Sequence, residues 1–353
     1  MHNKSKKLSL PIVLVIDAVL ALGLTIGVVS TITSSVNTNA DVNEASDDAE
    51  VKQAQEVVDT EIEPLEEEVY FDETIEESED EISAEPEDEV IIESNSLALK
   101  FADKFSEDVV QTETTYTSPN ISISIDEHKI GSGNNLITYY VADIYLANID
   151  CFQTYLANDK FGTENLQFVL DMDIDSGAIL AMSGDYYGAR ADSTEMRNGT
   201  LYRDVKTNMD ICVMYDDGSI VAYSPEEFNT DDVVNNGAIH IWSFGPTLVK
   251  DGQIVEKFND TRDIGVKNPR GALGYYEPGH YCFVLVDGRR PGHSEGMTFD
   301  ELANVFYELG CKTAYNLDGG GSATLTFNDS LVDIPSGSGR EISDALIIKE
   351  VSN

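Results

Sequence analysis

A triple-glycine turn is the part of the chain whose residue types are best suited to chemistry. Asp318 precedes Gly319, Gly320 and Gly321, and Ser322 follows them. Glycine loses the most backbone entropy on folding, so three in a row are costly unless the chain needs positive φ or must approach a ligand closely. Such a turn can form a concave nest of amide N–H groups for a phosphate or carboxylate, flanked here by a carboxylate and a hydroxyl. The alternative is a structural turn in which Asp318 caps its own backbone.

Three strands and a helix are predicted to position this turn. The continuous apolar run of residues 281–286 predicts a strand that is buried on both faces. Residues 312–316 and 323–327 are predicted to be the strands that enter and leave the glycines. Together these elements form an α+β unit with a special turn at its far end.

The helix of this unit has clear start and stop signals. Thr298 and Glu301 have the spacing of a capping box, in which their side chains satisfy the first free amides. Gly310 is the expected C-terminal stop. The spacing of the apolar residues places one set on a single face: Phe299, Leu302, Val305, Phe306 and Leu309.

The composition becomes globular after residue 95, which predicts a single mixed α+β domain with extensive β-sheet over residues 96–353. Residues 96–110 are expected to form a short helix leading into it. Asp216 and Gly218 give a hairpin signal between two strands. β-branched and aromatic residues predict further strands at 121–130, 136–147, 178–182, 211–215, 220–223, 238–244 and 247–249.

Residues 1–40 carry a membrane signal. A short basic start is followed by 22 almost wholly apolar residues from Leu8 to Val29, and a bilayer core needs roughly 20. Asp17 interrupts this run. The length favours an uncleaved anchor; a cleaved signal peptide, with Thr38 and Ala40 at the cleavage site, and a buried core helix are the alternatives. An anchor or a signal peptide exports the C-terminal domain, as a single-pass protein of the cell membrane or as a secreted one.

An acidic stretch separates this signal from the domain. Residues 41–95 hold 24 acidic side chains and one lysine, and the whole chain carries 22 basic and 65 acidic side chains, a net charge of −43. Such a density of like charges predicts a disordered tether. A solvated spacer is the simplest interpretation, and calcium sequestration or repulsion from an anionic envelope is the alternative. The charge argues against nucleic acid as a partner and against a basic patch on anionic lipid.

Several motifs resemble the phosphodiester glycosidase family, which includes the mannose 6-phosphate uncovering enzyme and bacterial exopolysaccharide-associated proteins. The hallmark is the string Ala-Tyr-Asn-Leu-Asp-Gly-Gly-Gly-Ser-Ala-Thr-Leu at residues 314–325. The chain departs from the family pattern at Ser183, where asparagine is frequent, and at Gly271, where threonine or serine is common. The resemblance covers about residues 120–352, with further matches at 182–187, 244–248, 251–252, 268–274, 286–290, 296–298 and 340–346.

The resemblance implies cleavage of the glycosidic bond of a sugar-1-phosphodiester in a cell-envelope or extracellular glycan. The leaving group is a phosphate monoester whose second pKa is about 6, so it departs with little help from a general acid. The remaining tasks are to hold the phosphate and stabilise an oxocarbenium-like transition state. Guanidinium groups and neutral donors suit the first task. The residues implied for it are Arg270, Arg340, Gly319, Gly320, Gly321, Ser322 and Asn316.

Carboxylates are implied for the second task. Asp318 leads, as a nucleophile or as a base for water, while Asp287 and Asp185 compete for the second acidic role. Ordinary ion pairs for Arg270 and Arg340, and a plain turn aspartate at Asp287, remain the alternatives. A polar loop with Arg289, Arg290 and His293 either lines the sugar pocket or is solvated.

No cofactor is expected. The five histidines lack metal-ligand spacing, and the acidic residues match no calcium-loop motif. The four cysteines are expected to be buried thiols, with three disulfide pairings as the alternative. The expected partners are a carbohydrate-phosphate substrate and, through the N-terminal helix, a membrane. A non-catalytic envelope module that binds anionic glycans, and a phosphodiesterase that cleaves P–O, are the alternative functions.

Overall fold

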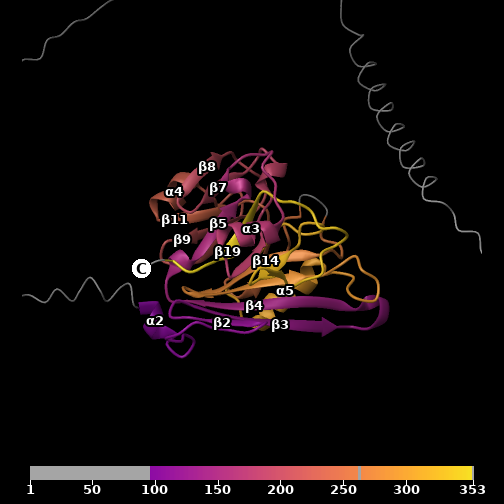
Figure 1. The fold of residues 1–353 in the computed structure, drawn as a ribbon. Helices are drawn as coiled ribbons and strands as arrows, with labels where there is room; N and C mark the ends of the chain where they lie inside the picture. Colours follow the sequence, from indigo (N-terminus) through magenta and orange to yellow (C-terminus); the bar gives the residue numbers. More distant parts are fainter. Residues whose placement is uncertain (1–95, 261–263, 352–353) are drawn as a thin grey trace, which may run out of the picture. The chain divides into compact units, whose positions relative to one another are not determined.

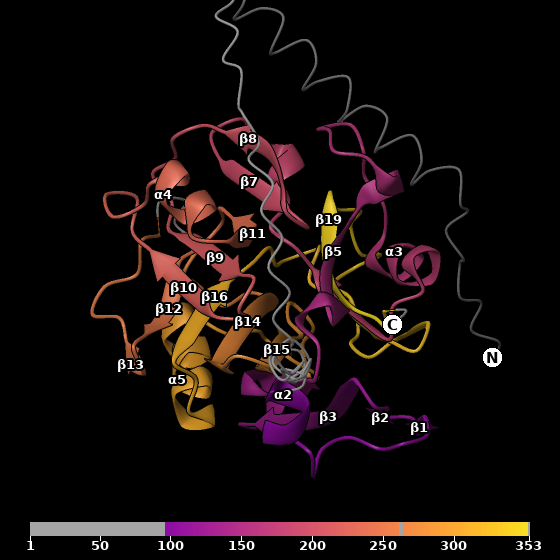
Figure 2. The same ribbon diagram turned by 90° about the vertical axis from the view of Figure 1, so that its left-hand side faces the viewer.

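Antiparallel β-sheets form most of the domain (Figures 1 and 2). The computed structural model describes residues 96–260 and 264–351, so the predicted signal and tether of residues 1–95 lie outside the described residues. A nine-stranded sheet has the order β1-β2-β3-β4-β15-β14-β16-β12-β13. Its strands are β1 (Val110–Gln111), β2 (Thr115–Thr117), β3 (Ile121–Ile130), β4 (Ile137–Leu146), β12 (Thr247–Lys250), β13 (Gln253–Ile254), β14 (Arg270–Glu277), β15 (His280–Val286) and β16 (Thr313–Asn316).

Two five-stranded sheets complete the domain, with the orders β10-β9-β11-β7-β8 and β18-β17-β6-β19-β5. Their strands are β5 (Phe152–Leu156), β6 (Leu180–Ser183), β7 (Thr194–Arg197), β8 (Thr200–Asp204), β9 (Ile211–Tyr215), β10 (Ile220–Tyr223), β11 (Ala238–Trp242), β17 (Leu325–Phe327), β18 (Ser330–Leu331) and β19 (Asp344–Ile348). In both views of the domain, β7, β8 and α4 lie at the end opposite β2 and β3 (Figures 1 and 2).

Helices are few and short among the described residues. They are α2 (Ser96–Lys100), α3 (Val169–Ser176), α4 (Thr230–Asn235) and α5 (Phe299–Leu309), with 3-10 turns at Gly133–Asn135, Ile149–Cys151, Ala157–Asp159 and Tyr187–Ala189. None of the helices within 96–260 or 264–351 is long and apolar enough to cross a membrane. The expectation of a mixed α+β domain dominated by sheet therefore holds for the described part of the chain.

β15 is buried on both faces, as its sequence predicts. Tyr281, Phe283 and Leu285 point into the core shared by the sheets. The alternate residues Cys282 and Val284 point to the opposite face, where they pack in a second cluster with α5. The strand needs apolar residues at every position because the nine-stranded sheet is covered on both sides there.

α5 begins and ends where the sequence predicts. The Thr298 hydroxyl accepts a hydrogen bond from the Glu301 amide, and the Glu301 carboxylate accepts one from the Thr298 amide. Gly310 ends the helix with φ at +83°. Burying the apolar face of α5 on the sheet fixes the start of β16, which leads to the triple glycine.

The first predicted helix is shorter than expected. α2 ends at Lys100, and Val110 already belongs to β1. Residues 101–104 form turns, and the Ser106 amide then pairs with the Ser118 carbonyl at 3.1 Å instead of continuing a helix. The prediction of a helix over 96–110 was therefore wrong for its second half.

β14 was not predicted because Gly271 and Gly274 weaken its strand pattern. A Cβ at position 274 would lie 2.6 Å from the Cys282 Sγ and 2.9 Å from the Cys311 Sγ. Glycine is needed where the two thiols meet over the strand, with 3.7 Å between their sulfurs. All four cysteines are buried and free in the structure, as the buried-thiol interpretation expected.

Candidate active site

The strand register brings three chain segments together at one edge of the nine-stranded sheet. Arg270, at the start of β14, pairs with Val286, at the end of β15. Ala272 pairs with Asn316, at the end of β16. The loop before β14, the loop after β15 and the loop after β16 therefore lie side by side, although up to about 50 residues separate them in sequence.

The glycine turn packs closely against this edge. A Cβ at Gly319 would lie 2.5 Å from the Pro269 carbonyl oxygen, and one at Gly320, whose φ is +64°, would lie 3.2 Å from the guanidinium of Arg289. The Gly320 amide donates to the Pro269 carbonyl at 3.0 Å, and the Ser322 amide donates to the Gly319 carbonyl at 3.1 Å. The prediction of an open nest is corrected here, because at least these two amides are already used within the protein.

Asp318 is held by two side chains. Its Oδ2 lies 2.7 Å from the Arg340 Nη2, and the Arg340 Nε donates to the Ser322 Oγ at 2.7 Å. Asp318 is only 7% exposed. Burial raises the pKa of its carboxyl above the ordinary value, while hydrogen bonding from Ser322 and the charge of Arg340 offset part of this rise.

A cavity of about 230 Å³ opens onto Asp318 and the three glycines. Among its described lining residues, three arginines face one carboxylate, a formal charge of +2 in a chain whose net charge is −43. Such a concentration of guanidinium groups favours an anionic ligand. The lining residues are Phe244, Ile264, Asn268, Arg270, Arg289, Leu317, Asp318, Gly319, Gly320, Gly321 and Arg340.

Arg289 contributes an exposed charge to this cavity. Its Nη2 and Nε donate to the Asn268 Oδ1 at 2.8 and 3.3 Å, and its own φ is +56°. The left-handed backbone turns the side chain over Gly320. From the sequence, Arg289 was expected either to line the sugar pocket or to lie in a solvated loop. In the structure it lines the cavity.

Arg270 lines the same cavity, but its guanidinium is committed to the protein. Its Nε donates to the Met297 carbonyl at 3.0 Å, and its Nη2 donates to the carbonyls of Ile264 and Val266 at 2.7 and 2.6 Å. The group also stacks on the Phe299 ring, 4.2 Å from the centroid. These donors hold the cavity wall, so phosphate would have to compete with backbone carbonyls for them, and the two-point grip stays a prediction.

Asp185 does not reach the cavity. It is fully buried, and its Oδ1 lies 2.9 Å from the Arg197 Nη2. Glu195 and Asp344 bind the same guanidinium, both at 2.8 Å. Despite burial, the neighbouring arginines hold the pKa of Asp185 below its usual value. Asp185 therefore belongs to a buried ion-pair network and not to the cavity lining, and its catalytic role stays a prediction.

Asp287 lies at the sheet edge but not in the cavity lining. Its Oδ2 is 2.5 Å from the His293 Nε2, and its Oδ1 accepts from the Ile334 amide at 3.1 Å. Burial raises the pKa of this carboxyl. The contacts tie the loop that precedes β19, and therefore Arg340, to the end of β15. Asp287 therefore positions the site through these contacts and does not line the cavity. Its catalytic role stays a prediction.

Asn316 is buried beneath the turn, where its Nδ2 donates to the Gly245 carbonyl at 2.8 Å. Its Oδ1 has no hydrogen-bond partner in the described part of the chain. The residue is not part of the cavity lining, and its contact with substrate stays a prediction.

Ser183 and Gly271 pack together behind the turn. The Ser183 hydroxyl donates to the Asp318 carbonyl at 3.4 Å, and a Cβ at Gly271 would lie 3.2 Å from both that carbonyl oxygen and the Ser183 Oγ. The two departures from the family pattern therefore fit each other sterically.

Tyr186 and Phe244 were not predicted as site residues. The Arg340 guanidinium lies 4.8 Å from the centre of the Tyr186 ring, a cation–π geometry. Phe244 lines the cavity. Both belong to quoted motifs, so their position beside matched residues was the available signal. The described residues contain no group of three or more metal-ligating side chains that could hold an ion.

Residues 176–349 match the family model described as phosphodiester glycosidase. The chain carries a phosphodiester glycosidase domain. This family assignment, expected from the glycine motif, covers Ser183, Arg270, Asp318 and Arg340, whereas β1 to β5 precede the matched residues.

The chain is also similar to curated proteins over part of its length. The chain is 31% identical over 196 residues to the SPbeta prophage-derived uncharacterized protein YomE of Bacillus subtilis, covering 53% of this chain and 30% of YomE. It is 32% identical over 104 residues to the N-acetylglucosamine-1-phosphodiester alpha-N-acetylglucosaminidase of Bos taurus, covering 30% of this chain and 19% of that enzyme. The chain therefore spans less than a third of the length of either relative.

The zebrafish N-acetylglucosamine-1-phosphodiester alpha-N-acetylglucosaminidase catalytic domain, auto-inhibited by its pro-peptide, has a similar fold. The TM-score is 0.54 at 18% identity, over 69% of this chain and 88% of that one. At this identity the similarity establishes the fold of the phosphodiester glycosidase domain and not its substrate.

Proposed function

We propose that this protein hydrolyses the glycosidic bond of a sugar-1-phosphodiester. The observation that carries the proposal is the Asp318 carboxyl, held 2.7 Å from Arg340 in an otherwise cationic cavity. The names of the bovine and zebrafish relatives make an N-acetylglucosamine 1-phosphodiester the first substrate to test.

The phosphate of the substrate lies between Arg289 and Arg340 in this proposal. Both guanidinium groups line the cavity, on either side of the glycine turn. Guanidinium can bind two phosphate oxygens at once, and the cations stabilise the charge that the leaving phosphate gains. Glycines at positions 319–321 let the diester approach the backbone without a side chain in its way.

Asp318 acts as the base that takes a proton from water. As that water attacks C1 of the sugar, the bond between C1 and the phosphate oxygen breaks, and its electron pair stays with the phosphate. The products are the free sugar and a phosphomonoester. A phosphate leaves without strong acid catalysis, so one carboxylate is sufficient, and Asp318 is the only one among the described lining residues.

The decisive experiment uses the full chain and the methyl phosphodiester of N-acetyl-α-glucosamine 1-phosphate. Reducing sugar and methyl phosphate are the expected products. Hydrolysis in ¹⁸O-labelled water should place the label in the sugar; label in the phosphate would identify a phosphodiesterase instead.

Asp318→Asn should lower kcat by at least roughly 100-fold. Asp171→Asn is the matched control, because Asp171 is an exposed residue of α3. Saturable binding of the diester without turnover by the wild-type protein would favour the non-catalytic glycan-binding module and refute the hydrolase.

Export belongs to the same proposal. The apolar run from Leu8 to Val29 supports a single-pass anchor or a signal peptide, and an envelope or extracellular glycan is the substrate that such a location would offer. Fractionation of cells that express the full chain tests this. Recovery of the domain from the cytoplasm alone would contradict it.

A further inference from the structure

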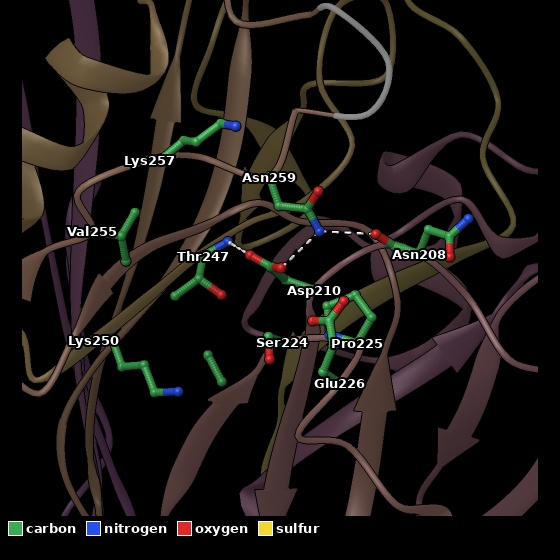
Figure 3. A pocket seen from close by; sticks show the side chains of 11 residues that line it. Asn208, Asp210, Ser224, Pro225, Glu226, Thr247, Lys250, Val255, Lys257 and Asn259 are labelled. Carbon is green, nitrogen blue, oxygen red and sulfur yellow. Dashed lines mark hydrogen bonds between the residues drawn. The ribbon is translucent and has the colours of Figure 1, made fainter.

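A second polar cavity lies beside the candidate active site. It has a volume of about 360 Å³, and its walls come from the segments before β9 and after β10, from β12, and from residues 255–259 (Figure 3). The residues that line it are Asn208, Asp210, Ala222, Ser224, Pro225, Glu226, Thr247, Lys250, Val255, Lys257 and Asn259.

Asp210 braces the floor of this cavity. Its Oδ2 accepts from the Thr247 amide at 2.9 Å, and its Oδ1 accepts from the Asn259 Nδ2, also at 2.9 Å. The same Nδ2 donates to the Asn208 carbonyl at 2.9 Å (Figure 3). Three chain segments are thereby fixed to one buried carboxylate, so the cavity is held open by the protein itself.

Several polar groups remain available to a ligand. Within 96–260 and 264–351, the Thr247 hydroxyl, the Asn259 Oδ1 and the Lys257 ammonium have no hydrogen-bond or ion-pair partner. Lys250 is half-exposed, and its ammonium lies 2.9 Å from Glu227. An unpaired lysine is unusual in a chain with 65 acidic and 22 basic residues.

The side chains divide the cavity into two chemical halves. Lys250 and Lys257 lie on one side, while Glu226 and Asn208 lie on the other (Figure 3). Two ammonium groups suit a phosphate, and the amide and hydroxyl groups between them suit the hydroxyls of a sugar. A phosphorylated saccharide matches both halves.

The wall between the two cavities is thin. Phe244 lines the cavity of Asp318 and Thr247 lines the second one, and three residues span at most about 10 Å. On the other side, Asp260 follows Asn259 and accepts from the amide of Ile264, a lining residue of the first cavity, at 2.9 Å. A ligand that reaches both cavities would therefore have only a short distance to span.

We propose that the second cavity binds the leaving-group side of the substrate, as a subsite for a phosphorylated saccharide. The inference rests on the proposed function and makes it more specific, because the substrate becomes a glycan with more than one phosphate rather than a simple diester. The phosphate beyond the cleaved bond lies between Lys250 and Lys257, and its sugar faces Thr247 and Asn259.

The test compares two substrates of the full chain. One is the methyl diester of N-acetyl-α-glucosamine 1-phosphate, and the other carries a phosphorylated disaccharide in place of methyl. Lys257→Gln should raise KM for the phosphorylated substrate about fivefold, well beyond any change for the methyl diester. Glu226→Gln should lower that KM, because it removes repulsion of the phosphate. Lys160→Gln is the control, because Lys160 is exposed and its side chain has no hydrogen bond or ion pair within the described residues.

Ionic strength gives an independent readout. The difference in KM between wild type and Lys257→Gln should shrink as the salt concentration rises from roughly 0.05 to 0.5 M, because the electrostatic screening length falls to a few Å. Equal changes of KM for both substrates, or a Glu226→Gln variant that weakens binding, would overturn the subsite.

Failure of the hydrolase proposal would be recognised separately. In that case the wild-type protein turns over neither substrate. Calorimetric titration of the phosphorylated disaccharide into wild type and Lys257→Gln then still tests the cavity. Loss of binding in the variant supports the subsite, and equal binding or none in both proteins overturns it.

Discussion

Arg340 reaches Asp318 from the loop between β18 and β19, with 2.7 Å between Nη2 and Oδ2. The same guanidinium donates to Ser322 at the other end of the glycine turn. One side chain thus joins the loop before β19 to the carboxyl of the candidate active site, and the charge state of that carboxyl depends on it.

Removal of Arg340 should move the pH dependence of the reaction. Burial raises the pKa of Asp318, and Arg340 lowers it, so Arg340→Met should raise that pKa further. Because a base must be ionised, the acidic limb of kcat/KM against pH should shift upward in the variant. Arg340→Lys keeps the charge and should shift it less. An unmoved limb in Arg340→Met would contradict the role of Asp318 as the base.

Arg270 should matter for stability. Arg270→Met leaves the carbonyls of Met297, Ile264 and Val266 without the donors that they have now. A loss of about 2–4 kcal/mol in the free energy of unfolding is expected. Urea denaturation measures it, and Arg289→Met, at an exposed position, is the control. A stable Arg270→Met variant with impaired phosphate binding would instead support the predicted grip on phosphate.

Asp333 should make stability depend on pH. Burial raises the pKa of its carboxyl to about 7, against about 3.9 in the unfolded chain. Between these values the folded state binds one more proton, so this group makes stability fall as the pH rises from roughly 4 to 7. Thermal melts of wild type and Asp333→Asn over this range should show a smaller decline in the variant. Parallel pH profiles would refute the shift.

The buried network around Arg197 should not tolerate loss of its cation. Arg197→Met leaves Asp185, Glu195 and Asp344 buried without the guanidinium that binds all three. The expected destabilisation is about 3–5 kcal/mol at neutral pH. It should be smaller near pH 5, where protonation neutralises carboxyls that have lost their partner. Denaturation at both pH values checks this, and equal losses would contradict it.

Local signals predicted much of the fold. β3, β9 and β10 have the predicted bounds, because alternation or a hairpin signal marks each of them. The capping box located α5 for the same reason. β14 was not predicted, because the need for glycine at position 274 comes from Cys282 and Cys311, which are distant in sequence.

The candidate site was likewise predictable where a local motif marks it and not where a residue's role depends on distant partners. The glycine motif located Asp318, and the closing motif supplied Arg340. Residue type alone did not separate Arg340, whose guanidinium binds the side chains of Asp318 and Ser322, from Arg270, whose partners are backbone carbonyls. Asp185 likewise depends on Arg197, which reaches it only after β6 and β7 have folded into different sheets.

The three glycines present only backbone to the cavity of Asp318, and this limits how a different sugar preference can be engineered. Position 319 has no room for a side chain beside the Pro269 carbonyl, and position 320 has a left-handed φ of +64° that other residues rarely adopt. Variation that reshapes the cavity must therefore occur at its rim, where Phe244, Ile264 and Asn268 supply side chains from loops. A small library randomised at those three codons would sample new specificities while leaving the sheet edge intact.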